Sequence, residues 1–158
     1  MRYFLIDKVT ELEIGKSVRG IKNVTLSDEI LHDHFPDHPI MPGALILEAI
    51  SQLAGFLLEM TVNKPDGPLK RSLLAQVELA KFHDFAGPGD QLDINIALDS
   101  LHEASAKVTA EVKAGSKRIA RASLMFVLRE VASEKVHEQR RYLYRLWTRD
   151  LQQPLTIL

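Results

Sequence analysis

Cysteine is absent from the 158 residues of this chain, which excludes a disulfide framework, a thiolate nucleophile and a cysteine metal site. Aromatic residues make up only 6%, and neither a basic stripe with interleaved aromatics nor a phosphate-binding glycine motif occurs. The formal net charge of −1 gives no electrostatic reason to bind a polyanion. These absences argue against a nucleic-acid partner.

No signal peptide is expected. The opening run MRYFLIDKVTELEIG has too short an apolar segment, and its charges come too early, for export. A reducing compartment is compatible with the lack of cysteine, so cytoplasmic location is the simplest interpretation. Hydrophobic residues make up 46% of the chain and no linker divides it, which predicts one domain with one core.

The most apolar stretch follows a proline-rich loop. No proline interrupts residues 44–60, and most of them favour helix, which predicts a helix of about 17 residues opened by Pro42 and Gly43. A surface helix has a single apolar stripe, whereas here the apolar residues cover more than one side, so burial on all sides is expected. The helix is expected to be too short, and too polar along one line, to span a membrane. Its large apolar residues are Leu45, Ile46, Leu47, Ile50, Leu53, Phe56, Leu57 and Leu58.

One polar line runs along this helix. Glu48, Ser51, Gln52, Gly55 and Glu59 are spaced by three and four residues, which places them on one face. A carboxylate on a buried helix is costly to desolvate unless it is paired or held neutral. Glu48 is therefore a candidate for chemistry. The alternative is that Glu48 merely reaches solvent or a neighbour near the start of the helix.

The loop before the helix supplies a candidate base, His34. Three prolines between His34 and Glu48 stiffen the chain, so that the histidine can fold back over the helix start. One imidazole and one carboxyl at the mouth of an apolar site suit general acid and base catalysis. Two alternatives are an ordinary solvated loop anchored by Phe35 and Ile40, and a metal site. The potential metal ligands are His32, Asp33, His34, Asp37 and His38.

Strands are predicted before the helix and after it. Residues 91–98 and 106–112 alternate strictly between apolar and polar side chains, and strands are also expected at 16–25, 73–82 and 117–129. One apolar face and one polar face indicate a curved antiparallel sheet covered on one side, and the long helix supplies that cover. The predicted class is α+β.

The segment HFPDHPIMPGALILEAISQ, residues 34–52, resembles the active-site signature of the 3-hydroxyacyl-[acyl-carrier-protein] dehydratases of the hot-dog fold. Residues 4–25, FLIDKVTELEIGKSVRGIKNVT, resemble the opening strand pair of the same family. The resemblance implies a hot-dog domain over residues 1–129, with a curved antiparallel sheet wrapped around one long buried helix. A metal site would leave the PGALILEA part of the match unexplained.

The resemblance also implies roles for individual residues. His34 would be the base, and Glu48 would bind and protonate the departing hydroxyl group. The Gly43 N–H would bind the thioester carbonyl, and Phe35 and Gln52 would contact the substrate. No cofactor and no metal are implied.

The implied reaction converts (3R)-hydroxyacyl thioesters to trans-2-enoyl thioesters in fatty-acid biosynthesis. The acyl group would be carried by acyl-carrier protein or coenzyme A, with no nucleic acid and no membrane span involved. In this family one site takes its base and acid from different subunits, so a homodimer is implied, and a trimer of dimers is usual among relatives. The alternatives are an acyl thioesterase, in which Glu48 would activate water, and a non-catalytic acyl-chain binding or assembly module.

Residues 130–158 extend beyond the resemblance. Val136, Leu143, Trp147 and Leu151 recur mostly at helical spacing, which predicts an amphipathic C-terminal helix packed on the same domain, or else a lid or partner contact. Basic residues common in the family are replaced by His83 and Asp84. The arginines of the extension are therefore a candidate docking surface for an acidic carrier protein. They are Arg140, Arg141, Arg145 and Arg149.

Overall fold

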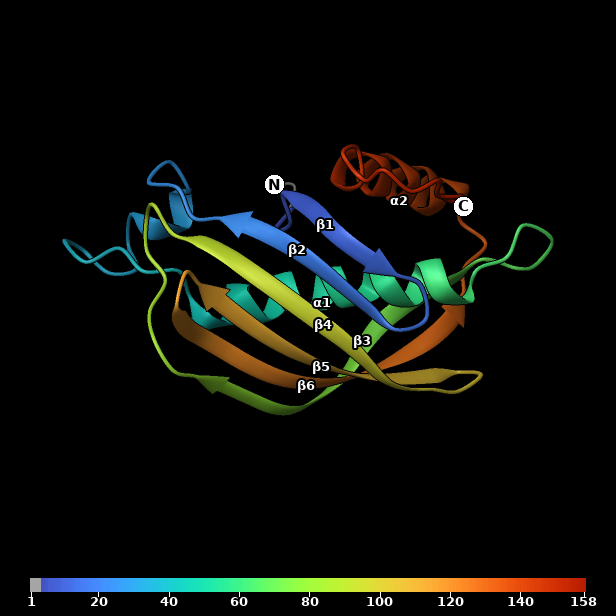
Figure 1. Cartoon of the computed structure of the whole chain (residues 1–158), viewed down its shortest axis with the longest axis horizontal. Helices are drawn as coiled ribbons and strands as arrows, with labels where there is room; N and C mark the ends of the chain where they lie inside the picture. Colours follow the sequence, from blue (N-terminus) through green and yellow to red (C-terminus); the bar gives the residue numbers. More distant parts are fainter. Residues whose placement is uncertain (1–3) are drawn as a thin grey trace.

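A six-stranded antiparallel sheet curves around one long helix, with a second helix outside the sheet (Figure 1). This computed structural model describes residues 4–158. The strand order is β1-β2-β4-β5-β6-β3. The strands are β1 (Lys8–Glu13), β2 (Ser17–Asn23), β3 (Lys70–Phe82), β4 (Gln91–Leu101), β5 (Ser105–Ala114) and β6 (Lys117–Glu130). The predicted α+β hot-dog architecture is confirmed.

The central strands bury alternate residues, as their sequence pattern predicts. Leu92, Ile94 and Ile96 of β4 are buried against the helix, whereas the residues between them face outward. β5 repeats this pattern along its whole length and joins β6 through a two-residue turn. Gly115 has a φ of 57° in that turn, a conformation that glycine adopts without steric cost.

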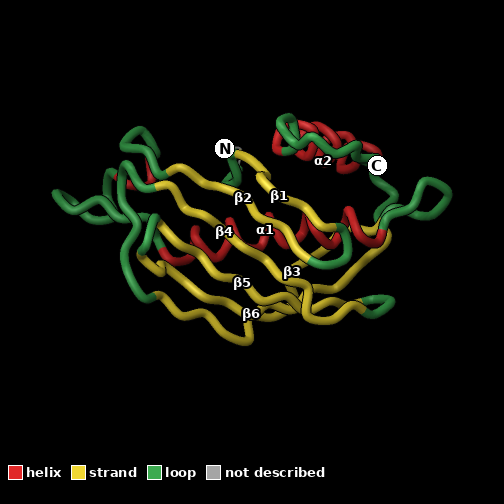
Figure 2. The backbone as a smooth tube through the Cα atoms, in the orientation of Figure 1, coloured by secondary structure: helices red, strands yellow, loops and turns green. Residues whose placement is uncertain are grey.

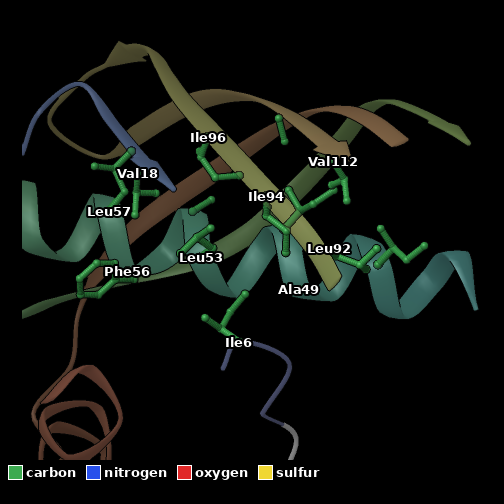
Figure 3. Close-up of a cluster of buried hydrophobic side chains, with 14 of the residues drawn as sticks. Ile6, Val18, Ala49, Leu53, Phe56, Leu57, Leu92, Ile94, Ile96 and Val112 are labelled. Carbon is green, nitrogen blue, oxygen red and sulfur yellow. The ribbon is translucent and has the colours of Figure 1, made fainter. Parts of the chain in front are cut away.

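The long helix α1 (Gly43–Val62) lies in the concave face of the sheet (Figure 1). Every residue from Leu53 to Glu59 is buried, so the expected burial on all sides holds for this half of the helix. Figure 3 shows Ala49 and Leu53 directed toward residues of the overlying strands. The helix has 20 residues, so the expectation that it is too short to cross a membrane was wrong. The helix is instead a core helix, because the sheet encloses it and most of its apolar length is buried.

Strand β3 departs from the pattern of its neighbours. It is an edge strand that pairs only with β6, and every residue from Leu73 to Phe82 is exposed. Large apolar side chains are among them: Leu73 is 52% exposed and Phe82 50% exposed. An exposed apolar edge strand is a ready platform for pairing with another chain.

The C-terminal helix α2 (Glu134–Trp147) packs beside β1 and against the second half of α1 (Figure 2). Tyr144 and Trp147 are buried, and their rings lie 4.8 and 6.2 Å from the ring of Phe56 on α1. Aromatic pairs at these distances stabilise a contact beyond the area they bury. The extension therefore contains the expected helix.

A single turn of 3-10 helix, η1 (Glu29–Leu31), precedes the His34 loop.

Candidate active site

The loop that carries His34 closes on itself by paired hydrogen bonds. The Ile40 N–H donates to the carbonyl oxygen of His34 at 2.8 Å, and Phe35 and His38 exchange two backbone hydrogen bonds of 3.0 Å. The Met41 N–H then donates to the carbonyl oxygen of Ala86 at 2.7 Å, which anchors the loop to the segment after β3. The proline-stiffened turn predicted from the sequence is thus formed before α1 begins.

These contacts fix the histidine tautomer. His34 Nδ1 lies 2.9 Å from the carbonyl oxygen of Ile40. A carbonyl oxygen can only accept a hydrogen bond, so Nδ1 carries the proton and donates. In the neutral imidazole the remaining nitrogen, Nε2, then holds the lone pair. His34 is therefore oriented to accept a proton at Nε2.

Phe35 lies beside this imidazole. The peptide bond between the two residues is cis, and their rings stack at 4.4 Å between centroids. Phe35 is 54% exposed, so its ring is available to a ligand or to another chain. Within residues 4–158, no three histidine or acidic side chains are placed to hold a metal ion, and the alternative metal site in this loop is not formed.

Glu48 lines a cavity of about 510 Å³ between α1, β3, β6 and α2. All five residues of the predicted polar line of α1 contribute to its wall. Gln52 donates a hydrogen bond to Glu48 Oε1 at 2.9 Å and accepts one from the Leu5 N–H at 3.0 Å. Gln52 therefore fixes the orientation of the half-buried Glu48 carboxylate.

Gly43 lies at the start of α1, where the first N–H groups have no carbonyl partner within the helix. A side chain here would meet the aromatic ring of Phe82, because a Cβ would lie 3.0 Å from it. Glycine thus allows the edge strand β3 to approach the helix start. The positive end of the helix dipole also favours negative charge at this position.

The structure brings the predicted residues together as two groups. His34 and Phe35 form one group on the loop, and Glu48 and Gln52 form the other on α1. His34 is not among the residues that line the Glu48 cavity. Within one chain, His34 and Glu48 therefore do not share one cavity.

Sequence reasoning missed a buried polar cluster at the far end of the cavity. Glu59 and Arg71 form an ion pair of 2.8 Å and are 2% and 3% exposed. The Tyr144 hydroxyl donates to Glu59 at 2.7 Å, and burial, followed by the charge of Glu59, raises the pKa of Tyr144. Arg71 also donates to Nδ1 of His137, whose Nε2 lies 2.8 Å from the carbonyl oxygen of Val131. The partners of Glu59 lie 12 and 85 positions away, and no local pattern in the sequence signals them.

Comparison with known proteins identifies the group to which this site belongs. Residues 1–123 match the family model of the FabA-like domain. The chain is 41% identical over 128 residues to a 3-hydroxyacyl-[acyl-carrier-protein] dehydratase FabZ of Caldanaerobacter subterraneus subsp. tengcongensis, covering 81% of this chain and 89% of the relative. This chain belongs to the FabA-like family. The FabA-like match covers both His34 and Glu48, and ends before α2 begins.

The fold of this FabA-like chain is also similar to that of solved structures. The dehydratase heterocomplex ApeI:P from Xenorhabdus doucetiae superposes with a TM-score of 0.65 at 15% identity, covering 87% of this chain and 89% of that one. The fluoroacetyl-CoA thioesterase FlK superposes with a TM-score of 0.62 at 12% identity, covering 84% and 98%. A dehydratase and a thioesterase share this fold, so fold alone does not decide the reaction.

Proposed function

We propose that this chain dehydrates 3-hydroxyacyl thioesters of acyl-carrier protein to trans-2-enoyl thioesters in fatty-acid biosynthesis. The observation that carries the proposal is the hydrogen bond from His34 Nδ1 to the Ile40 carbonyl, which leaves Nε2 as a base. The name of the FabZ relative supports the same reaction and the same carrier. A cytoplasmic location is proposed with it.

Each group has one task in this chemistry. His34 Nε2 removes the proton from the carbon next to the thioester carbonyl, and Glu48 donates a proton to the hydroxyl group as its bond to carbon breaks. Water leaves, and the electron pair of the broken C–H bond becomes the new double bond. The Gly43 N–H, at the positive end of α1, stabilises the negative charge that develops on the carbonyl oxygen. The reaction is redox-neutral, so it needs no redox cofactor.

We further propose that two copies of the chain assemble so that His34 of one meets Glu48 of the other. Two features support this assembly: the edge strand β3 exposes apolar side chains, and His34 lies outside the cavity that Glu48 lines. Phe82, exposed on β3 and packed on Gly43, would place this interface beside the carbonyl-binding N–H.

The test compares His34→Ala and Glu48→Gln with the parent on 3-hydroxyacyl-acyl-carrier protein, following enoyl-thioester formation. Each change should lower the rate by about 10²-fold or more, because each removes one proton-transfer group. His102→Ala and Glu103→Gln, at exposed positions of the β4–β5 turn, are the matched controls and should dehydrate at the parental rate. Release of free thiol without enoyl product would identify a thioesterase. Parental rates in either site variant would remove that residue from the proposed mechanism.

A mixing experiment tests the shared site. Inactive His34→Ala protein and inactive Glu48→Gln protein are combined under conditions that let subunits exchange. The hybrid dimer should regain activity, because one of its two active sites carries both intact groups. Exchange demonstrated by mass-labelled subunits, with no recovered activity, would count against a site built from two chains.

A further inference from the structure

The cavity beside Glu48 has a far end that the proposed chemistry does not use. There its wall is formed by Glu59 and Ser72 together with Gln139, Arg140 and Tyr144. Glu48 and Glu59 are eleven positions apart on α1, so they are separated by about 16 Å along the helix at about 1.5 Å per residue. The acyl chain attached to a thioester at Glu48 would extend toward this end.

Arg140 has no hydrogen-bond acceptor at this end of the cavity. Its Nε is buried and is without a partner among residues 4–158, although Oε2 of Glu59 lies 3.9 Å away. The carboxylate of Glu59 has no free hydrogen-bond acceptor position. Its Oε2 accepts from Arg71 and Tyr144, and its Oε1 accepts from the N–H and the hydroxyl of Ser72. A carboxylate has about four acceptor positions, and all are taken.

A ligand carboxylate would complete this arrangement. A buried N–H group without an acceptor is costly, and Glu59 Oε2, 3.9 Å from Arg140 Nε, is too far away to accept from it. A ligand carboxylate supplies acceptor oxygens in the geometry that arginine prefers, and the Arg140 side chain, which is 36% exposed, can be reached by it. The cavity wall between Glu48 and Arg140 also includes Ser51, whose hydroxyl group an all-alkyl chain cannot hydrogen-bond.

We infer that Arg140 binds the end of the acyl chain remote from the thioester, and that the preferred substrates carry a carboxylate at that end. This substrate class rests on the proposed dehydratase function. The distance of about 16 Å corresponds to roughly a dozen chain bonds at about 1.2 Å per bond of an extended chain, so preference for the carboxylate depends on chain length.

The experiment uses two series of 3-hydroxyacyl pantetheine thioesters, one ending in methyl and one in carboxylate, with lengths up to about a dozen chain bonds. At the length that reaches Arg140, kcat/KM should be roughly tenfold or more higher for the carboxylate-ended substrate, as a charge-assisted hydrogen bond gives. Arg140→Met should bring this ratio close to one, and Arg140→Lys should retain part of it. Arg129→Met, which changes an exposed arginine on β6, should leave the ratio at its parental value.

Binding measured without turnover separates this inference from the proposed function. Isothermal titration with the corresponding acyl thioesters that lack the 3-hydroxyl group should show tighter binding of the carboxylate-ended series, and Arg140→Met should abolish the difference. If neither hydroxyacyl series is dehydrated, the proposed function fails and titration alone decides the inference. Equal binding of both series at every length, or a difference in binding that survives Arg140→Met, would overturn the inference that Arg140 binds a carboxylate. A water molecule would then be the hydrogen-bond partner of the Arg140 Nε.

Discussion

Replacing Glu59 by glutamine tests whether this buried carboxylate holds α2 on α1. Glu59 is 2% exposed and accepts hydrogen bonds from Arg71, Tyr144 and Ser72. Glutamine keeps the shape but puts an amide donor in place of one acceptor oxygen, and it leaves Arg71 as a buried cation without its counter-charge. Removing one partner of a buried pair costs about 3–5 kcal/mol, which is the expected loss in the free energy of unfolding.

The matched control is Glu134→Gln on helix α2. Glu134 pairs with Arg141 at the surface, where its side chain is 68% exposed, and such pairs contribute about 0–1 kcal/mol. The chemical change is identical in both variants, so the difference between them measures the effect of burial. At about 2–4 °C per kcal/mol for a chain of this size, Glu59→Gln should lower the Tm by roughly 6–20 °C, and the control by about 4 °C at most.

Two spectroscopic signals follow the unfolding. Trp147 is the only tryptophan of the chain, and it is 2% exposed, so its fluorescence reports the burial of α2. Far-ultraviolet circular dichroism reports the sheet and α1. Urea unfolding is measured at one protein concentration, because the stability of an assembly depends on it. A Glu59→Gln protein that loses no more stability than Glu134→Gln would refute the role given to Glu59.

Two further predictions concern residues that touch this region. Burial raises the pKa of Tyr144 above its ordinary value of 10.0, and Glu59 raises it further, so the phenol ionises first in the unfolded chain and stability falls as pH rises above about 10. Urea unfolding across this pH range should show a shallower decline for Tyr144→Phe than for Tyr142→Phe, which changes a surface residue; equal declines would contradict this. Gly55→Ala should cost about 1–3 kcal/mol, because its Cβ would lie 2.8 Å from Oγ of Ser72. In a double-mutant cycle with Ser72→Ala the two losses should be less than additive, and strict additivity would exclude the clash.

The sequence alone predicts a strand or helix when all the side chains on one of its faces share the same surroundings. The alternation of apolar and polar residues in β4 and β5 follows from one face packing on α1 and the other facing outward. The polar line of α1 was predicted from helical spacing alone, and all five of its residues line one cavity. In both cases the pattern depends only on the geometry of one element.

Features that depend on contacts between distant segments could not be predicted in this way. The sequence predicts a strand over residues 73–82 but not its position at the sheet edge, which leaves its apolar residues exposed. The four arginines of the extension suggested one basic surface. The structure sets only Arg140 apart, because it lies against the cavity, whereas Arg141, Arg145 and Arg149 line one hollow on the surface of the extension.

The contrast between Glu48 and Glu59 explains why only one of them is assigned chemistry. Both lie on the same polar line of the same helix, and both line the same cavity. Glu59 is enclosed by four hydrogen-bond donors, one of them a guanidinium group, so its lone pairs are occupied and its charge is neutralised. Glu48 is half-buried and is oriented by an amide, Gln52, which leaves acceptor positions for a substrate hydroxyl group. A carboxylate that must exchange a proton needs such a neutral neighbour, because a fixed cation would hold it ionised. The same helix thus carries a structural carboxylate at its enclosed end and, nearer its start, the carboxylate that we propose as the proton donor.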